Sequence, residues 1–258
     1  MRLSPIFRTA AAEIQIALAL MTRLPSLPLR DPVPPIHSAV WAFPLAGLAV
    51  GSVTALALGA ATWSGLPAGL SAGLALAAGL LATGAIHEDG LADLADGFGG
   101  GRDPTHKLQI MRDSRIGSYG ALALIMSLGL RWQALAVLAA RDLGLCCAAV
   151  VAIAMTSRAA LPVALALMPS ARPDGLGHAA RQTGVMRPAV AVLIGVVAGL
   201  ALLGPVTLGV IILLQTAALG LMSRLAMRQI GGQTGDVLGA MQQMSEIVAL
   251  LAVVAMAG

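Results

Sequence analysis

Long uninterrupted stretches of hydrophobic residues dominate the chain. Residues 38–86 contain no Asp, Glu, Lys or Arg, and neither do residues 188–223. A membrane-spanning helix needs about 20 apolar residues, so the first stretch is long enough for two spans and the second for nearly two. Because the hydrophobic positions are continuous and do not alternate with polar ones, the pattern favours helices over a transmembrane barrel.

This pattern predicts an all-α, polytopic membrane protein with about seven transmembrane helices. Gly204 and Pro205 would separate the fifth span from the sixth, and Arg131 would lie in a polar break between the third and the fourth. The residues before the first span predict an amphipathic interfacial helix or a short buried helix. We expect residues 1–258 to form a single integral-membrane catalytic domain. The expected spans cover approximately residues 39–63, 66–87, 116–130, 133–157, 188–203, 206–223 and 237–257.

The composition agrees with a membrane protein and excludes other classes. Charged residues make up 11% of the chain, whereas soluble domains carry about a quarter. The net charge is +4, but the chain has only 3 Phe, 3 Trp and 1 Tyr, too few for a surface that stacks nucleic-acid bases. Cys146 and Cys147 are adjacent in an apolar stretch, which gives neither a disulfide framework nor zinc-ligand spacing.

The basic residues gather in loops that seven spans would place on one side of the membrane. By the positive-inside rule, that side is the cytoplasm. The acidic segment described next follows the second span, so we expect it to face the cytoplasm too. The residues that set this orientation are Arg2, Arg8, Arg23 and Arg30, then Arg102, Lys107, Arg112 and Arg115, then Arg172, Arg181 and Arg187, and finally Arg224 and Arg228.

The acidic residues are concentrated in one segment, with six of the 12 between positions 88 and 113. In a helix, Asp89, Asp93 and Asp96 would lie on one stripe, within about 60° of one another. Three carboxylates on one stripe repel each other unless a cation neutralises them, and Mg²⁺ binds carboxylate oxygens together with substrate phosphates. The segment therefore predicts a Mg²⁺ site, with a solvated polar face or a helix cap as the alternative.

Glycines and cations follow the carboxylates directly. The triplet 99–101 stands beside Arg102, and Lys107, Arg112 and Arg115 come shortly after it. Backbone N–H groups of glycine-rich turns and guanidinium groups both bind phosphate oxygens. Carboxylates with cations at this spacing are typical of phosphoryl transfer, in which positioning and charge neutralisation supply most of the catalysis.

Four blocks of the sequence carry a family resemblance: TRLP at residues 22–25, HEDGLADLADG at 87–97, IMRDSRIG at 110–117 and GGQTGD at 231–236. Together they closely resemble the adenosylcobinamide-GDP ribazoletransferase (cobalamin synthase) family. The resemblance implies a Mg²⁺-dependent, multipass enzyme of the bacterial inner (cytoplasmic) membrane. Such an enzyme joins adenosylcobinamide-GDP to α-ribazole or α-ribazole 5′-phosphate, releases GMP and forms adenosylcobalamin or its 5′-phosphate.

Two other functions are kept as alternatives. Asp93-x-x-Asp96-Gly97 is similar to the start of the CDP-alcohol phosphotransferase signature D-x-x-D-G-x-x-A-R, but Arg102 stands one position late. The departure argues against a phospholipid substrate. An ion-coupled membrane transporter is the second alternative, because acids within the membrane also form ion pathways.

The candidate site residues have three expected roles. His87 is a candidate general base, with an interfacial histidine as the alternative, and Asp113 could instead be ion-paired with its neighbouring arginines. We expect Arg158 to contact phosphate, since an isolated cation in the membrane is costly and usually functional, whereas Glu246 is left outside the site as the partner of a buried arginine. The candidates are catalytic His87, Asp93 and Asp113; metal-binding Asp89, Asp93, Asp96, Asp113 and Asp236; and substrate-binding Arg23, Gly100, Arg102, Lys107, Arg112, Ser114, Arg115, Arg158, Gln233 and Thr234.

The expected partners are the two substrates and the membrane lipid, and no nucleic acid. A homo-oligomer is left open by the sequence.

Overall fold

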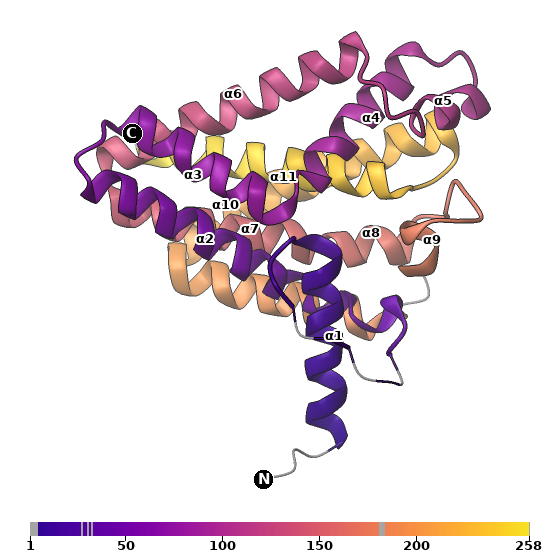
Figure 1. The fold of residues 1–258 in the computed structure, drawn as a ribbon, viewed down its shortest axis with the longest axis horizontal. Helices are drawn as coiled ribbons and strands as arrows, with labels where there is room; N and C mark the ends of the chain where they lie inside the picture. Colours follow the sequence, from indigo (N-terminus) through magenta and orange to yellow (C-terminus); the bar gives the residue numbers. More distant parts are fainter. Residues whose placement is uncertain (1–4, 27, 30, 32, 181–183, 258) are drawn as a thin grey trace.

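A computed structural model describes residues 5–26, 28–29, 31, 33–180 and 184–257. The regular elements of these residues are all helices (Figure 1), so the all-α prediction is confirmed. Arg2, Arg30 and Arg181, which contribute to the predicted orientation, lie outside the described residues. The elements are α1 (Pro5–Met21), η1 (Ile36–Ser38), η2 (Val40–Ala42), α2 (Phe43–Trp63), α3 (Ala68–Thr83), α4 (Ile86–Gly100), α5 (Pro104–Ile110), α6 (Ser118–Arg141), α7 (Leu143–Ala159), α8 (Leu161–Leu167), α9 (Leu176–Ala180), α10 (Met186–Ile230) and α11 (Gly235–Met256).

Five helical segments are long and apolar enough to cross a membrane, which confirms the prediction of a polytopic membrane protein. The pair α3–α4 provides a sixth candidate, bent by 87°. The expected number of about seven is therefore reached only if α10, a helix of 45 residues, counts as two spans. The five segments are Val40–Trp63, Ser118–Arg141, Leu143–Leu167, Met186–Ile230 and Gly235–Met256.

Helix α10 is broken at the predicted position. Gly204 has a non-helical backbone (φ 75°, ψ 172°) and Pro205 follows it. Gly199 packs against the side chain of Leu208, although a continuous helix would separate positions nine residues apart by about 13 Å. The two halves of α10 therefore fold back on each other as a hairpin.

The predicted break at Arg131 is wrong. Helix α6 continues through Arg131 to Arg141, and the chain turns at Asp142. The carboxylate of Asp142 accepts a hydrogen bond from the N–H of Leu145 at 2.9 Å and so caps α7. Arg131 remains inside the helix because buried carboxylates on α4 and α11 neutralise its charge.

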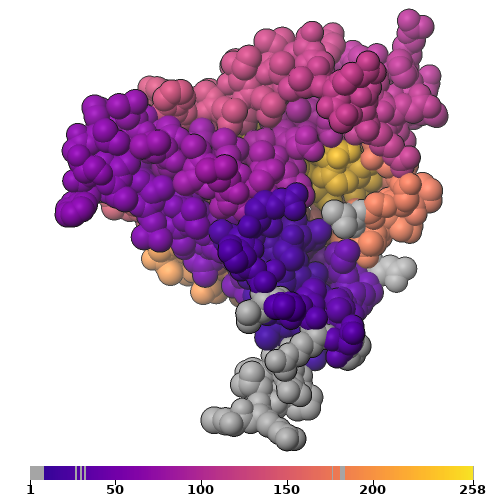
Figure 2. Space-filling model, in the orientation of Figure 1, coloured from indigo at the N-terminus to yellow at the C-terminus, as the bar shows by residue number. Residues whose placement is uncertain are grey.

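The N-terminal helix α1 packs against α2 and lies across the direction of the other long helices (Figure 1). This placement agrees with the predicted interfacial or short buried helix. In Figure 2, the yellow C-terminal part of the chain reaches the surface between the magenta and the orange segments. The site described below lies where α4, α5, α9 and the start of α11 come together.

Two local features place α4 there. Gly84 and Ala85 both adopt the left-handed conformation (φ 64° and 56°), which turns the chain sharply between α3 and α4. Gly90 then packs against the backbone of Asp236, and Gly239 packs against the backbone of His87. Since glycine allows two helix backbones to approach closely, this crossing brings the acidic helix α4 beside the first turn of α11.

Candidate active site

The four carboxylates of α4 point to different surroundings. Glu88 is buried, with 6% of its surface exposed, whereas Asp89 is exposed and Asp93 is half-buried. Within the described part of the chain, no hydrogen bond or ion pair reaches the carboxylates of Asp89 and Asp93. The predicted stripe therefore divides into two acids, Asp89 and Asp93, that are free to bind a ligand and one, Asp96, that already has protein partners.

Asp96 has such partners. It is buried, and its two carboxylate oxygens accept hydrogen bonds from the N–H groups of Gly117 at 2.7 Å and Gly120 at 2.9 Å. A Cβ atom on either glycine would collide with this carboxylate. A negative charge at the beginning of α6 satisfies unpaired N–H groups and interacts favourably with the helix dipole. The structure thus gives Asp96 a structural contact, and its predicted role as a metal ligand stays a prediction.

Acidic residues from α4 and α11, which are distant in sequence, meet at Asp93. Its carboxylate lies beside those of Asp89, Asp96 and Asp236, and the nearby guanidinium of Arg172 is the compensating charge. Arg172 Nη2 lies 3.6 Å from Asp236 Oδ2 and also donates a hydrogen bond to the carbonyl oxygen of Leu108. Negative charge exceeds positive charge at this point, which favours the binding of a cation.

A polar cavity of about 430 Å³ opens beside these acids. Asp236 and Thr234 line one side of it, and the loop before α9 contributes Arg172 and Asp174. Across the cavity, Arg112 Nη2 contacts both oxygens of Asp174, at 2.6 and 2.9 Å. The lining residues are Arg112, Ser170, Arg172, Asp174, Gly175, Gly177, His178, Thr234, Gly235 and Asp236.

Gln233 holds this loop in place. Its side chain is fully buried, and its Nε2 donates a hydrogen bond to the carbonyl oxygen of Gly177 at 3.1 Å. Its backbone pairs with that of Ser170 in an isolated parallel bridge. Thr234 caps α11 through the N–H of Val237 and contacts Asp236 Oδ2 at 3.2 Å. Of the two predicted substrate ligands, Thr234 lines the cavity and Gln233 positions its wall.

Several predicted residues on either side of α5 do not line the polar cavity. Arg115 forms an ion pair with Asp113 at 2.6 Å, and this guanidinium holds the pKa of the Asp113 carboxyl below its usual range. Ser114 and Arg102 are exposed as well. None of these side chains lines the cavity that contains Asp236. Their catalytic, metal-binding and substrate-binding roles stay predictions.

Three further predicted substrate-binding residues lie at the margins of the site. The side chain of Lys107 donates a hydrogen bond to Gln229 at the end of α10. Gly100 lies in the last turn of α4, near Ile110. Arg23 extends across Gly84, at the bend between α3 and α4. The structure thus places Arg112 and Thr234 in the cavity with Asp236. Lys107 lies beside the end of α10 and Arg23 at the bend between α3 and α4.

His87 does not line the polar cavity. It is 5% exposed, and it lines a separate apolar cavity formed with side chains of α1, α8 and α11. Its Nδ1 atom is buried and has no hydrogen-bond partner. A role as general base stays a prediction, and the position of the ring does not support it.

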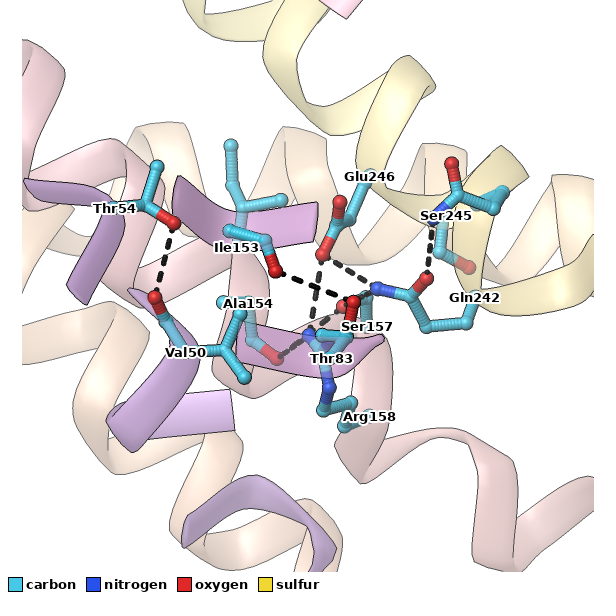
Figure 3. A network of polar contacts seen from close by, with 12 residues as sticks. Val50, Thr54, Thr83, Ile153, Ala154, Ser157, Arg158, Gln242, Ser245 and Glu246 are labelled. Carbon is cyan, nitrogen blue, oxygen red and sulfur yellow. Dashed lines mark hydrogen bonds and ion pairs between the residues drawn. The ribbon is translucent and has the colours of Figure 1, made fainter. Parts of the chain in front are cut away.

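Arg158 belongs to a buried network in the interior of the bundle (Figure 3). It is 2% exposed, and its Nη1 lies 3.2 Å from Glu246 Oε1, which confirms the expected pairing of Glu246 with a buried arginine. Gln242 donates hydrogen bonds to Glu246 and to Ser157. Binding of phosphate by Arg158 would require this ion pair to break.

Sequence reasoning missed Arg172 and Asp174 as site residues and Arg131 as a network residue. The loop PSARPDG entered the sequence analysis only through its charge. Its place in the cavity depends on Gln233, whose contacts no sequence pattern indicates. Arg131 could have been found, because Glu88 and Glu246 both stand in apolar surroundings and each needs a cation.

The fold and the site together define a polytopic membrane protein of the phosphoryl-transfer type, with carboxylates and arginines around one polar cavity. A family model described as cobalamin-5-phosphate synthase matches residues 13–254, so the chain belongs to this family. The resemblance inferred from the four sequence blocks is thereby confirmed.

Three relatives named adenosylcobinamide-GDP ribazoletransferase illustrate the similarity. The protein from Bradyrhizobium diazoefficiens is 48% identical over 95% of this chain and 94% of its own. The Mesorhizobium japonicum protein is 42% identical over 96% and 94%, and the Azorhizobium caulinodans protein is 46% identical over 85% of each chain. No solved structure matches the chain.

Proposed function

We propose that this protein is an adenosylcobinamide-GDP ribazoletransferase. It joins adenosylcobinamide-GDP to α-ribazole or α-ribazole 5′-phosphate, releases GMP and forms adenosylcobalamin or its 5′-phosphate. The observation that carries the proposal is the meeting of Asp93 and Asp236 beside Arg172, in a chain that matches this family over residues 13–254. The family match favours this reaction over phospholipid synthesis and over ion transport.

The proposed reaction replaces one ester partner of a pyrophosphate. A hydroxyl oxygen of the ribazole attacks the phosphorus that carries the cobinamide, and the bond from this phosphorus to the bridging oxygen breaks. GMP leaves with that oxygen, and the hydroxyl proton passes to a carboxylate, for which Asp93 is the candidate. Arg112 and Arg172 line the cavity and would orient the phosphate oxygens, because guanidinium groups bind such oxygens through paired N–H donors.

The donor set of this site fits Mg²⁺. Among the described residues, no group of three or more His, Cys, Asp and Glu side chains is arranged to hold a metal ion by itself. Mg²⁺, however, usually takes one or two carboxylates and completes its shell with waters and substrate phosphates. Asp93 and Asp236, with Asp89 nearby, would hold the ion, which would neutralise the charge that develops on the leaving phosphate.

We further propose that the site faces the cytoplasm of a bacterial inner membrane and that the chain acts as one catalytic domain. The arginine-rich loops identified in the sequence support this orientation. The substrates and the surrounding lipid are the proposed partners, and a homo-oligomer stays a prediction.

GMP release tests the proposed function. The full-length protein, purified in detergent or reconstituted in liposomes, is mixed with adenosylcobinamide-GDP, α-ribazole 5′-phosphate and Mg²⁺, and GMP is measured by chromatography. We expect equal amounts of GMP and corrinoid product, and no GMP when the ribazole is omitted. Absence of GMP with either ribazole form would refute the proposal.

A further inference from the structure

An apolar cavity with one polar group lies beside the polar cavity. It measures about 90 Å³ and is lined by parts of α1, α2, α4, α8, α9 and α11. Met21, Phe43, Leu161 and Leu165 contribute to its apolar wall. Among its described lining residues, His87 carries the only side chain with a nitrogen or oxygen atom. The Nδ1 of His87 is buried without a hydrogen-bond partner.

An unpaired buried nitrogen is unfavourable unless a ligand satisfies it. A polar group removed from water without a partner destabilises the protein, and native proteins leave few such groups. A ligand that pairs with His87 would restore the missing hydrogen bond. The cavity therefore suits a ligand that is mostly apolar and has one hydrogen-bonding atom.

This apolar cavity adjoins the polar one. Gly177 and Gly235 line both of them. A molecule whose reacting group lies next to Asp236 could therefore extend an apolar part toward His87. The contact of Gln233 with Gly177 holds this shared wall in place.

We propose that the apolar cavity is the subsite for the base of the ribazole substrate, an inference that rests on the proposed function. This base, a dimethylbenzimidazole, is a flat apolar bicycle with one unsubstituted ring nitrogen. The imidazole of His87 lines the cavity, and in its neutral form one ring nitrogen donates a hydrogen bond to that nitrogen of the base. The methyl-substituted ring contacts the apolar wall, and the ribose lies in the larger polar cavity with its hydroxyls near the carboxylates.

The other substrate groups fit this cavity poorly. Guanine has several donors and acceptors on its edges, and a wall with one polar side chain would leave most of them unpaired. The corrin ring is far larger than 90 Å³. Phosphates and riboses need charged or polar partners, which line the neighbouring cavity instead. The benzimidazole edge is the only substrate group that is both small and apolar.

Steady-state kinetics of the full-length protein test this assignment. His87→Leu removes the hydrogen bond, and we expect the KM for α-ribazole to rise about 3- to 10-fold while the KM for adenosylcobinamide-GDP stays unchanged. His87→Asn keeps a nitrogen donor near the position of Nδ1, so it should recover part of the loss. Leu238→Phe adds volume to the apolar cavity and should raise the same KM.

A matched control uses the same substitution elsewhere. Leu219→Phe adds volume to a different groove, which lies between α8 and α10, and should leave both KM values unchanged. Direct binding of the free base shows whether a change in KM reflects the cavity itself. In equilibrium dialysis, 5,6-dimethylbenzimidazole should bind saturably to the wild type and more weakly to Leu238→Phe. The free base should also compete with α-ribazole and not with adenosylcobinamide-GDP.

Four results would overturn the proposal, three of them from kinetics. Those three are unchanged KM values for α-ribazole in His87→Leu and Leu238→Phe, an equal rise in KM for both substrates, and competition of the free base with adenosylcobinamide-GDP. Loss of turnover in His87→Leu with unchanged binding of the base would also reject it, because the histidine would then act on the chemistry. A wild type that releases no GMP would refute the proposed function instead, and dialysis would still test the cavity.

Discussion

Helices α4 and α11 each contribute to two polar regions that differ in charge. The interior region is balanced, and the region at the polar cavity has an excess of negative charge. In the interior, Arg131 contacts Glu88 at 2.7 Å and Glu246 at 2.9 Å, and Arg158 contacts Glu246 at 3.2 Å. Two carboxylates thus face two arginines. At the polar cavity, in contrast, Asp236 lines the wall with Asp93 and Asp89 nearby, and these acids are opposed mainly by Arg172.

The difference shows which region is built to bind a ligand. A charge buried without a partner in an apolar interior is strongly destabilising. Each of these four charged side chains therefore has an ion-pair partner, and the network holds α4, α6, α7 and α11 together. The polar cavity is open to water and tolerates an excess of negative charge. The carboxylates of Asp89 and Asp93 have no hydrogen bond or ion pair within the described residues, and a Mg²⁺ ion brought with a pyrophosphate would neutralise this excess.

Removal of Arg131 should have the largest effect on stability. Arg131→Met leaves Glu88 and Glu246 buried with fewer partners, and loss of one member of such a pair costs about 3–5 kcal/mol. The free energy of unfolding in detergent, from chemical denaturation, should fall by that amount. As a control, the combined change with Glu88→Gln should recover part of the loss. An unchanged midpoint would show that the network contributes little.

Removal of the charge on Asp93 or Asp236 should lower the rate of GMP release without changing the stability of the protein. Asp93→Asn and Asp236→Asn each keep the side-chain size but remove a charge, and we expect GMP release to fall about 10²–10³-fold, as when one transition-state contact is lost. Higher Mg²⁺ should restore part of the activity. Thermal unfolding should match the wild type, and full activity in both variants would remove these acids from the mechanism.

A variant of Asp96 tests whether this residue has a structural role or binds the metal ion. Because its carboxylate accepts two backbone hydrogen bonds at the start of α6, Asp96→Asn should lower the free energy of unfolding by about 1 kcal/mol. The fall in GMP release should stay below about tenfold, the rate change that corresponds to 1.4 kcal/mol. A much larger fall that Mg²⁺ reverses would instead make Asp96 a metal ligand, as the sequence predicts.

The smallest effect on stability is expected at Arg112. Its pair with Asp174 is exposed, and exposed pairs contribute about 0–1 kcal/mol, so Arg112→Ala should leave thermal unfolding nearly unchanged. It should raise the KM for adenosylcobinamide-GDP, because Arg112 lines the polar cavity. Asp174→Ala serves as the control for loss of the pair alone. An equal effect of both variants on KM would mean that Arg112 only anchors the loop.

The sequence predicted the fold class well because hydrophobic length and continuity determine membrane helices locally. It placed the α10 break correctly, since Gly204 and Pro205 are local signals. It misplaced the break at Arg131 because the charge of this residue is neutralised by Glu88 and Glu246, which are distant in sequence. A hydropathy pattern contains no information about such pairing.

The same limit applies to the site. The spacing of Asp89, Asp93 and Asp96 placed them on one helix, but it could not show that Asp96 turns toward the backbone of Gly117. The approach of Asp236 to α4 depends on the glycine crossing at Gly90. The place of Arg172 depends on the loop that Gln233 holds. These are tertiary contacts, and a single sequence does not report them.

Metal binding, measured directly, tests the central claim that the carboxylates of Asp93 and Asp236 bind a divalent cation together with the pyrophosphate. Mn²⁺ replaces Mg²⁺ in the full-length protein, and electron paramagnetic resonance follows free and bound Mn²⁺ with and without adenosylcobinamide-GDP. We predict that the substrate tightens Mn²⁺ binding in the wild type and that Asp93→Asn and Asp236→Asn weaken it, whereas Glu88→Gln does not. Equal Mn²⁺ affinity in the wild type and both Asp variants would contradict the account.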